Sequence, residues 1–174
     1  MNTIESEMCF GEYPDERYYR IENSTVHKLA GENIKSVEFI YYKDHDLIFL
    51  EAKSTCPHPD SKGSEDKEKA RKYEEYFSDI TDKFVDSLNM FSALKLGKYD
   101  YSDQVGQLIQ KTSNFKRTTF VFILVIGKAE EGWLSGPKAE LERRLLKING
   151  IWKSRVLVLN ASLAERHGLI KKQL

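Results

Sequence analysis

Three residues of a predicted β-hairpin, Glu38, Glu51 and Lys53, have types and spacing that suit phosphate chemistry. The stretch from Ser36 to Thr55, SVEFIYYKDHDLIFLEAKST, reads as two apolar strands around the polar turn KDHD. With the turn centred on the middle of KDHD, Glu38 faces Glu51 across the hairpin. Directly opposed residues share one face of a sheet, so we expect the two acids and the lysine to converge on one surface.

Two facing carboxylates among apolar side chains need a proton or a cation to offset their repulsion. Opposed Cβ atoms lie about 5 Å apart, and at an effective dielectric of about 20 the repulsion is on the order of 3 kcal/mol. Mg²⁺ and Mn²⁺ take carboxylate oxygens, and Lys53 beside such an ion would orient a water or neutralise charge on a phosphate. The pattern predicts metal-assisted hydrolysis of a phosphodiester, with Glu38 and Glu51 as ligands and Lys53 as the polarising group.

The alternative is a hairpin with one wet face, on which Lys53 and Glu51 form an ion pair in solvent. The rest of that face is apolar, with Ile40 and Phe49 nearest to the acids. This composition favours a cleft over an exposed surface.

The elements that position the hairpin follow from periodicity and from turn residues. In chain order we expect a short strand over 17–24, a turn over 27–33, hairpin strands over about 35–42 and 47–53, a loop over 54–64, a long amphipathic helix over 65–96, a connection over 98–116, a buried strand over 118–127, a helix over 137–148, a strand over 155–160 and a last helix from about 162.

Capping residues and the polar helix face complete this prediction. Ser64 is the expected N-cap of the long helix, and Gly136 with Pro137 at N1 is expected to begin the next one. The polar face of the long helix is expected to be solvated; it carries Glu74, Asp79, Lys83 and Asp86.

This order of elements indicates an α/β protein with a mixed central sheet and flanking helices. Its 174 residues suit a single domain, 1–174. We expect a core over about 17–127 and a basic helix-strand-helix over about 137–168 at the C-terminal end.

An acid in one strand, then Glu-x-Lys in the next strand, then a long helix and a further strand resembles the PD-(D/E)xK nuclease superfamily. The matching residues are Glu38 and Glu51-Ala52-Lys53, and the similarity covers roughly residues 17–127. The resemblance implies a restriction-endonuclease-like core, two acids that bind Mg²⁺ and a lysine that assists the attacking water. Glu38 stands in place of the usual aspartate, and Glu22 is the candidate for a further acid if its strand neighbours the hairpin.

Charge is divided unevenly along the chain, although the net charge is zero. Residues 1–104 hold 22 acidic against 14 basic residues, and residues 105–174 hold 5 against 13. Such a split is a hint of contact with a polyanion, or of two halves that attract each other. We expect nucleic acid as the partner, bound by Arg143, Arg144, Lys147, Lys153 and Arg155. Trp133 and Trp152 flank this segment and suit either stacking on bases or completion of the core.

Several classes of protein are not indicated. The first sixteen residues are acidic and lack the apolar block of a signal peptide, and the longest apolar run, 120–127, is too short to span a bilayer. Cys9 and Cys56 give neither a disulfide framework nor metal-ligand spacing, so we expect a reducing, cytoplasmic setting without membrane association. The sequence sets no oligomeric state and is compatible with a homodimer.

Two other functions remain open at this stage. One is a catalytically silent PD-(D/E)xK-like module that binds a protein or nucleic acid. The other is a metal-dependent enzyme that acts on a different phosphate ester.

Overall fold

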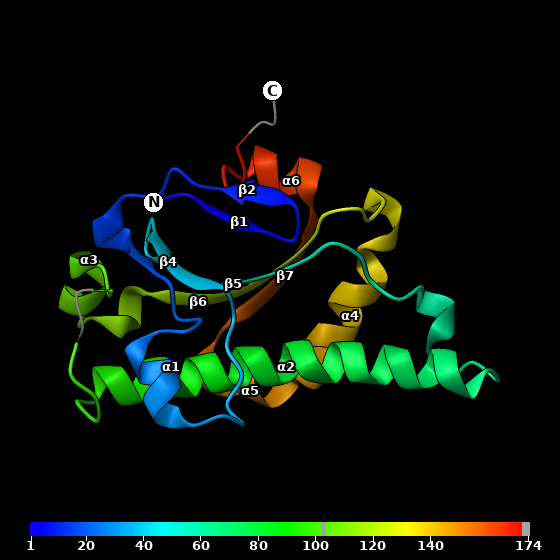
Figure 1. The fold of residues 1–174 in the computed structure, drawn as a ribbon, viewed down its shortest axis with the longest axis horizontal. Coiled ribbons are helices and arrows are strands. Elements are labelled where there is room, and N and C mark those ends of the chain that lie inside the picture. The colour runs from blue at the N-terminus through cyan, green and yellow to red at the C-terminus, as the bar shows by residue number, and fades with distance from the viewer. Residues whose placement is uncertain (102–103, 172–174) are drawn as a thin grey trace.

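The predicted hairpin lies at the centre of a five-stranded sheet in the computed structural model, which describes residues 1–101 and 104–171 (Figure 1). The strands are β1 (Thr3–Glu5), β2 (Met8–Phe10), β3 (Tyr18–Tyr19), β4 (Phe39–Lys43), β5 (Asp46–Lys53), β6 (Thr119–Ile126) and β7 (Arg155–Asn160). The α-helices are α1 (Thr25–Ala30), α2 (Lys67–Lys95), α3 (Gln107–Lys111), α4 (Ser135–Arg144), α5 (Leu146–Trp152) and α6 (Ala161–Arg166).

The sheet is mixed, as the sequence predicts. Its order is β3-β4-β5-β6-β7, with antiparallel pairing from β3 to β5 and parallel pairing from β5 to β7. The crossovers between the parallel strands run through α2 and through α4 and α5. The basic C-terminal segment therefore contributes the fifth strand of the same sheet.

The hairpin turn has two residues, Asp44 and His45, because Lys43 and Asp46 are already paired. Asp44 and His45 have φ values of 48° and 70°, so both adopt the left-handed conformation of a type I′ turn. This turn matches the twist of the flanking strands and sets the register, in which Lys43 pairs with Asp46 and Ile40 with Phe49.

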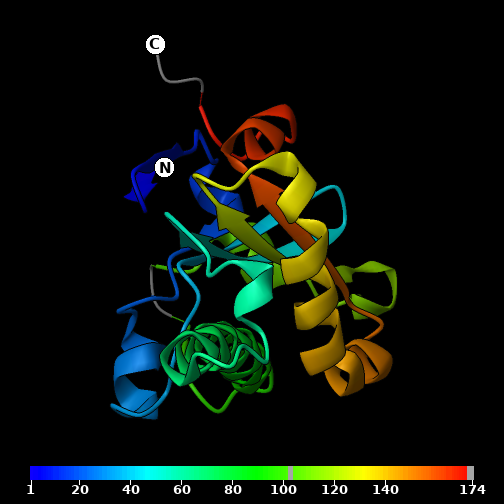
Figure 2. The ribbon, with the colours of Figure 1, turned by 90° about the vertical axis from the view of Figure 1, so that its right-hand side faces the viewer.

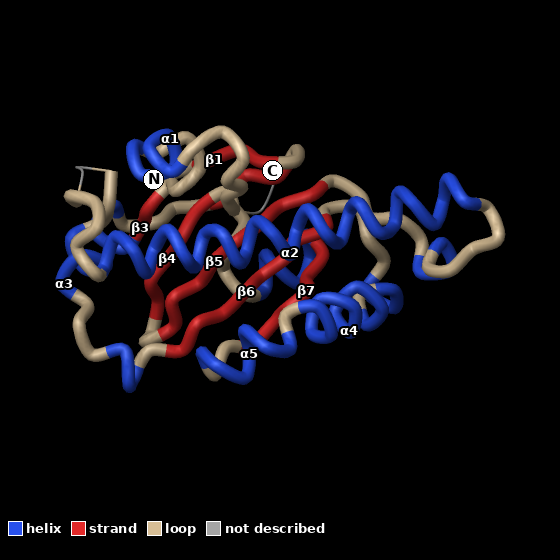
Figure 3. The backbone as a smooth tube through the Cα atoms, turned by 90° about the horizontal axis from the view of Figure 1, so that it is seen from below, coloured by secondary structure: helices blue, strands red, loops and turns tan. Residues whose placement is uncertain are grey.

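Other elements cover both faces of the sheet (Figure 2), and a separate apolar cluster lies on each face. On one face, side chains such as Phe49 and Phe122 pack against the apolar stripe of α2, which crosses the strands obliquely (Figure 3), and against α4. On the other face, Phe39 and Leu50 pack against the β1-β2 hairpin and α6. Alternation along β5 thus directs Phe49 and Glu51 towards α2.

The structure corrects several local predictions before the hairpin. Residues 1–16 contain the β1-β2 hairpin, which the sequence analysis does not predict. Strands of three residues are too short to show a clear periodic pattern. The strand predicted over 17–24 is limited to Tyr18–Tyr19. The predicted turn over 27–33 overlaps helix α1, which begins at Thr25 and which Ser24 caps by accepting a hydrogen bond from the His27 N–H.

Helix boundaries also differ. Asp66, not Ser64, caps α2, because its carboxylate accepts hydrogen bonds from the N–H groups of Glu68 and Lys69. The helix predicted over 137–148 is two helices, α4 and α5, separated at Leu145.

The starts of the last helices differ as well. Helix α4 begins at Ser135, so Pro137 lies later in its first turn than N1, where its missing N–H still has no intrahelical acceptor. The last helix begins at Ala161 rather than near Ser162, and the Asn160 side chain caps it by accepting a hydrogen bond from the Leu163 N–H.

Candidate functional site

Glu51 is a completely buried carboxylate between the sheet and α2. Its Oε1 lies 2.7 Å from Lys83 Nζ of α2 and 3.1 Å from Lys53 Nζ of its own strand. Its Oε2 is buried and has no hydrogen-bond partner among the described residues. One oxygen of Glu51 is thus paired with two ammonium groups, while the other faces none.

Burial raises the pKa of Glu51, and the charges of Lys83 and Lys53 only partly offset that effect. Burial is the largest single effect on Lys83 and lowers its pKa, but the charge and hydrogen bond of Glu51, with the charges of Glu38 and Asp79, together outweigh it, so the pKa of Lys83 is raised. The ion pair therefore keeps Lys83 cationic within the core.

Lys53 links this buried group to the surface. Its side chain is 29% exposed, and its Nζ also lies 3.7 Å from Asp79 Oδ2 on α2. Asp79 is in turn paired with Lys35 at 3.1 Å. Because Glu51 is buried, the alternative of a wholly exposed Glu51–Lys53 pair is wrong.

Glu38 does not form the ladder pair with Glu51 that the sequence predicts. The ladder of β4 begins at Phe39, and the Glu38 N–H donates instead to the Leu50 carbonyl at 3.0 Å. The chain bends here because Val37 packs into the α2-side core, with its N–H donating to Ser87 Oγ at 2.9 Å. The same bend means that Ser36 and Lys53 are not ladder partners.

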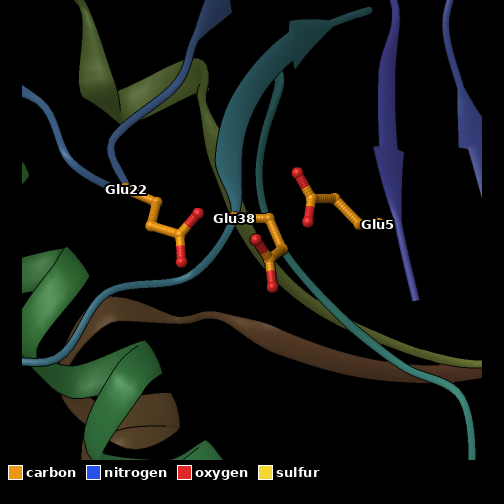
Figure 4. Close-up of side chains that lie close together, drawn as sticks. All are labelled: Glu5, Glu22 and Glu38. Atoms are coloured by element: carbon orange, nitrogen blue, oxygen red, sulfur yellow. The ribbon is translucent and has the colours of Figure 1, made fainter.

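Glu38 lies instead beside two other acids, Glu5 and Glu22 (Figure 4). One carboxylate oxygen from each of the three residues lies within 4.8 Å of the other two. Glu5 is the last residue of β1, and Glu22 follows β3, which pairs with β4. Arg20 bridges the outer two acids, with its Nη2 2.8 Å from Glu5 Oε1 and 3.4 Å from Glu22 Oε2.

Burial raises the pKa of Glu38 to about 8, and the negative charges of Glu51, Glu22 and Glu5 add to this effect. Lys83 acts weakly in the opposite direction. The residue is only 8% exposed, and its Oε2 has no hydrogen-bond partner among the described residues. In metal-free protein at neutral pH, Glu38 is therefore mostly protonated.

The carboxylate oxygens at this end of the sheet are suitable ligands for a hard divalent cation. Glu38 and Glu51 each present a buried carboxylate oxygen that lacks a hydrogen-bond partner in the described part of the chain. A buried, unsatisfied polar atom is costly, and a cation would satisfy it. A cavity of about 500 Å³ borders Glu22, and its wall also includes Tyr18 and Arg20.

The predicted basic patch is partly neutralised within the protein. Arg155 pairs with Asp46 at 2.5 Å, at the hairpin-turn end of the sheet. Lys147 and Lys153 are exposed and form no ion pair with the described residues.

The two arginines of the patch belong to a clamp around Glu140, which is buried in α4. Arg143 and Arg144 each lie 2.6 Å from Glu140 Oε1, and Lys62 of the loop before α2 lies 2.7 Å from its Oε2. The hydrogen bond from Arg143, helped by those from Lys62 and Arg144 against the effect of burial, lowers the pKa of Glu140 to about 2. The clamp ties that loop to α4.

The two tryptophans lie at opposite ends of β6. Trp152 packs edge-on against Phe120 at its start. Trp133 is 46% exposed and borders a cavity of about 160 Å³ whose wall includes Ile126, the register partner of Lys53. Of the two, Trp133 is therefore at the same end of the sheet as Lys53.

Sequence reasoning missed two charged residues of the site. Lys83 was expected to be solvated, but its side chain is only 17% exposed because it reaches from α2 to Glu51. The position of Lys83 next to the apolar stripe of α2 was a weak indication of its burial, since a long side chain can bury its aliphatic stem. Glu5 gave no signal, because only the tertiary position of β1 brings it to Glu38.

No protein-family model, curated protein or solved structure matches this chain. Within the described residues, no helix has both the length and the apolar character that crossing a membrane requires.

Proposed function

We propose that the protein is a metal-dependent nuclease with a PD-(D/E)xK-like, restriction-endonuclease-like core. The observation that carries the proposal is the pair of buried carboxylates, Glu38 and Glu51, each with one unpartnered oxygen, next to a partly exposed lysine, Lys53. The order of elements adds support, because a mixed sheet with β5 and β6 parallel across a long helix suits such a core.

In this proposal Glu38 and Glu51 hold Mg²⁺ or Mn²⁺, and Glu22 lies close enough to Glu38 to contribute. A bound ion of this type lowers the pKa of a coordinated water and polarises a phosphate oxygen. Lys53 would stabilise negative charge that develops on the scissile phosphate. Lys83 would hold the Glu51 side chain in place by pairing with its Oε1.

The surroundings of Lys53 suit a nucleic-acid substrate. Trp133 stands half-exposed at the rim of the nearby cavity, where it would stack on a base next to the scissile phosphate. The positive charge of the C-terminal segment would hold the phosphate backbone elsewhere along the substrate.

The test is cleavage of single-stranded and duplex DNA and RNA in the presence of Mg²⁺ or Mn²⁺. We expect wild-type protein to cleave at least one of these substrates and to be inactive in a chelator. Glu51→Gln and Lys53→Met should each lower kcat by about 100-fold or more, the size of effect seen when a group that stabilises transition-state charge is removed.

The chain supplies a matched control, because a second acid-x-lysine tripeptide, Glu65-Asp66-Lys67, lies exposed at the start of α2. Glu65→Gln and Lys67→Met should leave cleavage unchanged. Retention of metal-dependent cleavage by folded Glu51→Gln and Lys53→Met variants would exclude this site.

One observation favours the second candidate, a catalytically silent binding module. Lys53 and Lys83 already neutralise Glu51 without any metal. For such a module we expect calorimetry to detect no Mg²⁺ or Mn²⁺ binding that depends on Glu51, although a protein or nucleic acid still binds.

A further inference from the structure

When Glu38 is ionised, as cation binding requires, the charges around it do not balance within the described part of the protein. Three carboxylates, those of Glu5, Glu22 and Glu38, have oxygens within 4.8 Å of one another, and Arg20 is the cation paired with two of them. The Glu51 carboxylate, in contrast, has two ammonium groups within 3.1 Å. The negative charge that lacks a compensating cation is therefore larger around Glu38 than around Glu51.

A second, independent observation points to a ligand at these acids. Glu38 is more than nine-tenths buried, and its Oε2 has no hydrogen-bond partner among the described residues, although its carboxylate lies between those of Glu5 and Glu22 (Figure 4). The Arg20 guanidinium is turned towards the outer two acids, with its Nη2 bonded to Glu5 Oε1 and Glu22 Oε2, and among the described residues it forms no ion pair with Glu38. A hard divalent cation among the three carboxylates would satisfy the buried oxygen and their combined charge.

We propose that Glu5, Glu22 and Glu38 form a second site for a hard divalent cation, distinct from the Glu38–Glu51 site, with Glu38 shared between the two. This proposal extends the proposed function and rests on it for the role of Glu38 in the first site. Glu5 would then be a metal ligand supplied by the N-terminal β-hairpin, outside the segment that resembles the nuclease core.

Arg20 gives the site a built-in competitor. Its guanidinium pairs with Glu5 Oε1 and Glu22 Oε2, so it competes for two of the proposed ligands, and its side chain is 48% exposed and can turn into solvent when a cation binds. Removing this guanidinium should therefore strengthen cation binding. A purely structural acid cluster held together by Arg20 would show no such gain.

The experiment is titration of metal-free protein with Mn²⁺, followed by calorimetry and by electron paramagnetic resonance of the free ion. We expect two Mn²⁺ ions per wild-type chain, and one in each of Glu5→Gln and Glu51→Gln. Arg20→Met should bind the ion of the Glu5 site about tenfold more tightly than wild type. Circular dichroism establishes that each variant is folded.

The matched control is Glu7→Gln, in the turn of the same hairpin, whose carboxylate lies 2.8 Å from Lys128 Nζ. This variant should retain two ions, which separates a specific site from a general effect of negative charge.

The outcomes separate the second site from the nuclease proposal. Loss of an ion in Glu5→Gln supports the second site even if no substrate is cleaved. Unchanged Mn²⁺ stoichiometry and affinity in a folded Glu5→Gln variant overturns it, even if Glu51 is needed for cleavage. Weaker Mn²⁺ binding in Arg20→Met also overturns it.

Discussion

Glu38 combines a carboxyl group with a position in which negative charge is unfavourable. The residue is buried, and the acids Glu51, Glu22 and Glu5 all raise its pKa, while Lys83 opposes them only weakly. Because the pKa of Glu38 differs between the folded and the unfolded protein, the free energy of unfolding depends on pH.

Glu38→Gln should remove much of this pH dependence. The pKa of Glu38 is about 8 in the folded protein against a reference value of 4.5, so the stabilisation is fully present below about pH 4.5 and is lost as the pH rises through about 8. At about 1.4 kcal/mol per pKa unit, this shift corresponds to a change of up to about 5 kcal/mol. Urea unfolding of metal-free protein between pH 5 and about 8.5 measures it.

The control for this measurement is Glu32→Gln, at an exposed position in the loop after α1. It should keep the wild-type pH profile. Equal slopes for wild type and Glu38→Gln over this range would contradict the buried, protonated state of Glu38.

At the scale of elements, the contact between α2 and β5 combines apolar packing with one buried ion pair. Phe77, Phe84 and Phe91 pack against the sheet, and Lys83 reaches Glu51 at 2.7 Å. Removing Lys83 leaves the buried Glu51 carboxylate with only the partly exposed Lys53 as a partner, and such a poorly compensated charge in the core is more destabilising than replacing both members of the pair.

Lys83→Met should therefore lower the free energy of unfolding by about 3 kcal/mol at neutral pH. The loss should diminish towards acidic pH, where Glu51 takes up a proton, and adding Glu51→Gln should recover most of it. Lys72→Met, on the exposed face of α2, should have little effect. Equal unfolding midpoints for Lys83→Met and Lys72→Met would show that the ion pair does not stabilise the fold.

Sequence periodicity was sufficient for the elements with strong patterns. The alternation around KDHD predicted β4, β5, their turn and their register, and the spacing of aromatic residues predicted α2. Short elements such as β1, β2 and α1 could not be predicted, because three to six residues hold too few repeats and are stabilised by tertiary contacts.

The site was only partly predictable for a related reason. The Glu51–Lys53 pairing follows from alternation along one strand, which sequence specifies well. The position of Glu38 depends on a bend that the packing of Val37 imposes, and those of Lys83 and Glu5 depend on how α2 and β1 lie in space. Local patterns do not contain that information.

At the scale of the whole molecule, the exposed basic residues and the candidate site lie at opposite ends of the sheet. Lys53 pairs with Ile126, at the end of β6, whereas Arg155 pairs with Val121, near its start, and Lys153 precedes it. The strand register puts the two regions about 17 Å apart along the sheet, which is the length of about five base pairs of duplex.

Substitution of both exposed lysines should therefore affect long substrates selectively. Lys147→Gln/Lys153→Gln should weaken binding of a duplex of about 20 base pairs and reduce the slope of log K against log salt by about 2. Binding of a tetranucleotide should be unchanged, because it does not span the distance. Fluorescence anisotropy over a salt series measures both.

The matched control replaces two exposed lysines of the acidic half of the chain, as Lys67→Gln/Lys69→Gln. This pair should leave the salt slope at its wild-type value. Identical slopes for both double variants would place the nucleic-acid contact elsewhere on the surface.

The clamp around Glu140 has a practical consequence for handling the protein. Its carboxylate has a pKa of about 2, so its stabilising contribution is intact above about pH 4.5 and declines only below that. Glu38, with a pKa of about 8, is already neutral at about pH 5 and holds a cation poorly. A brief acidic dialysis should thus yield apoprotein without a chelating agent, with the loop before α2 still fastened to α4 and ready for reloading.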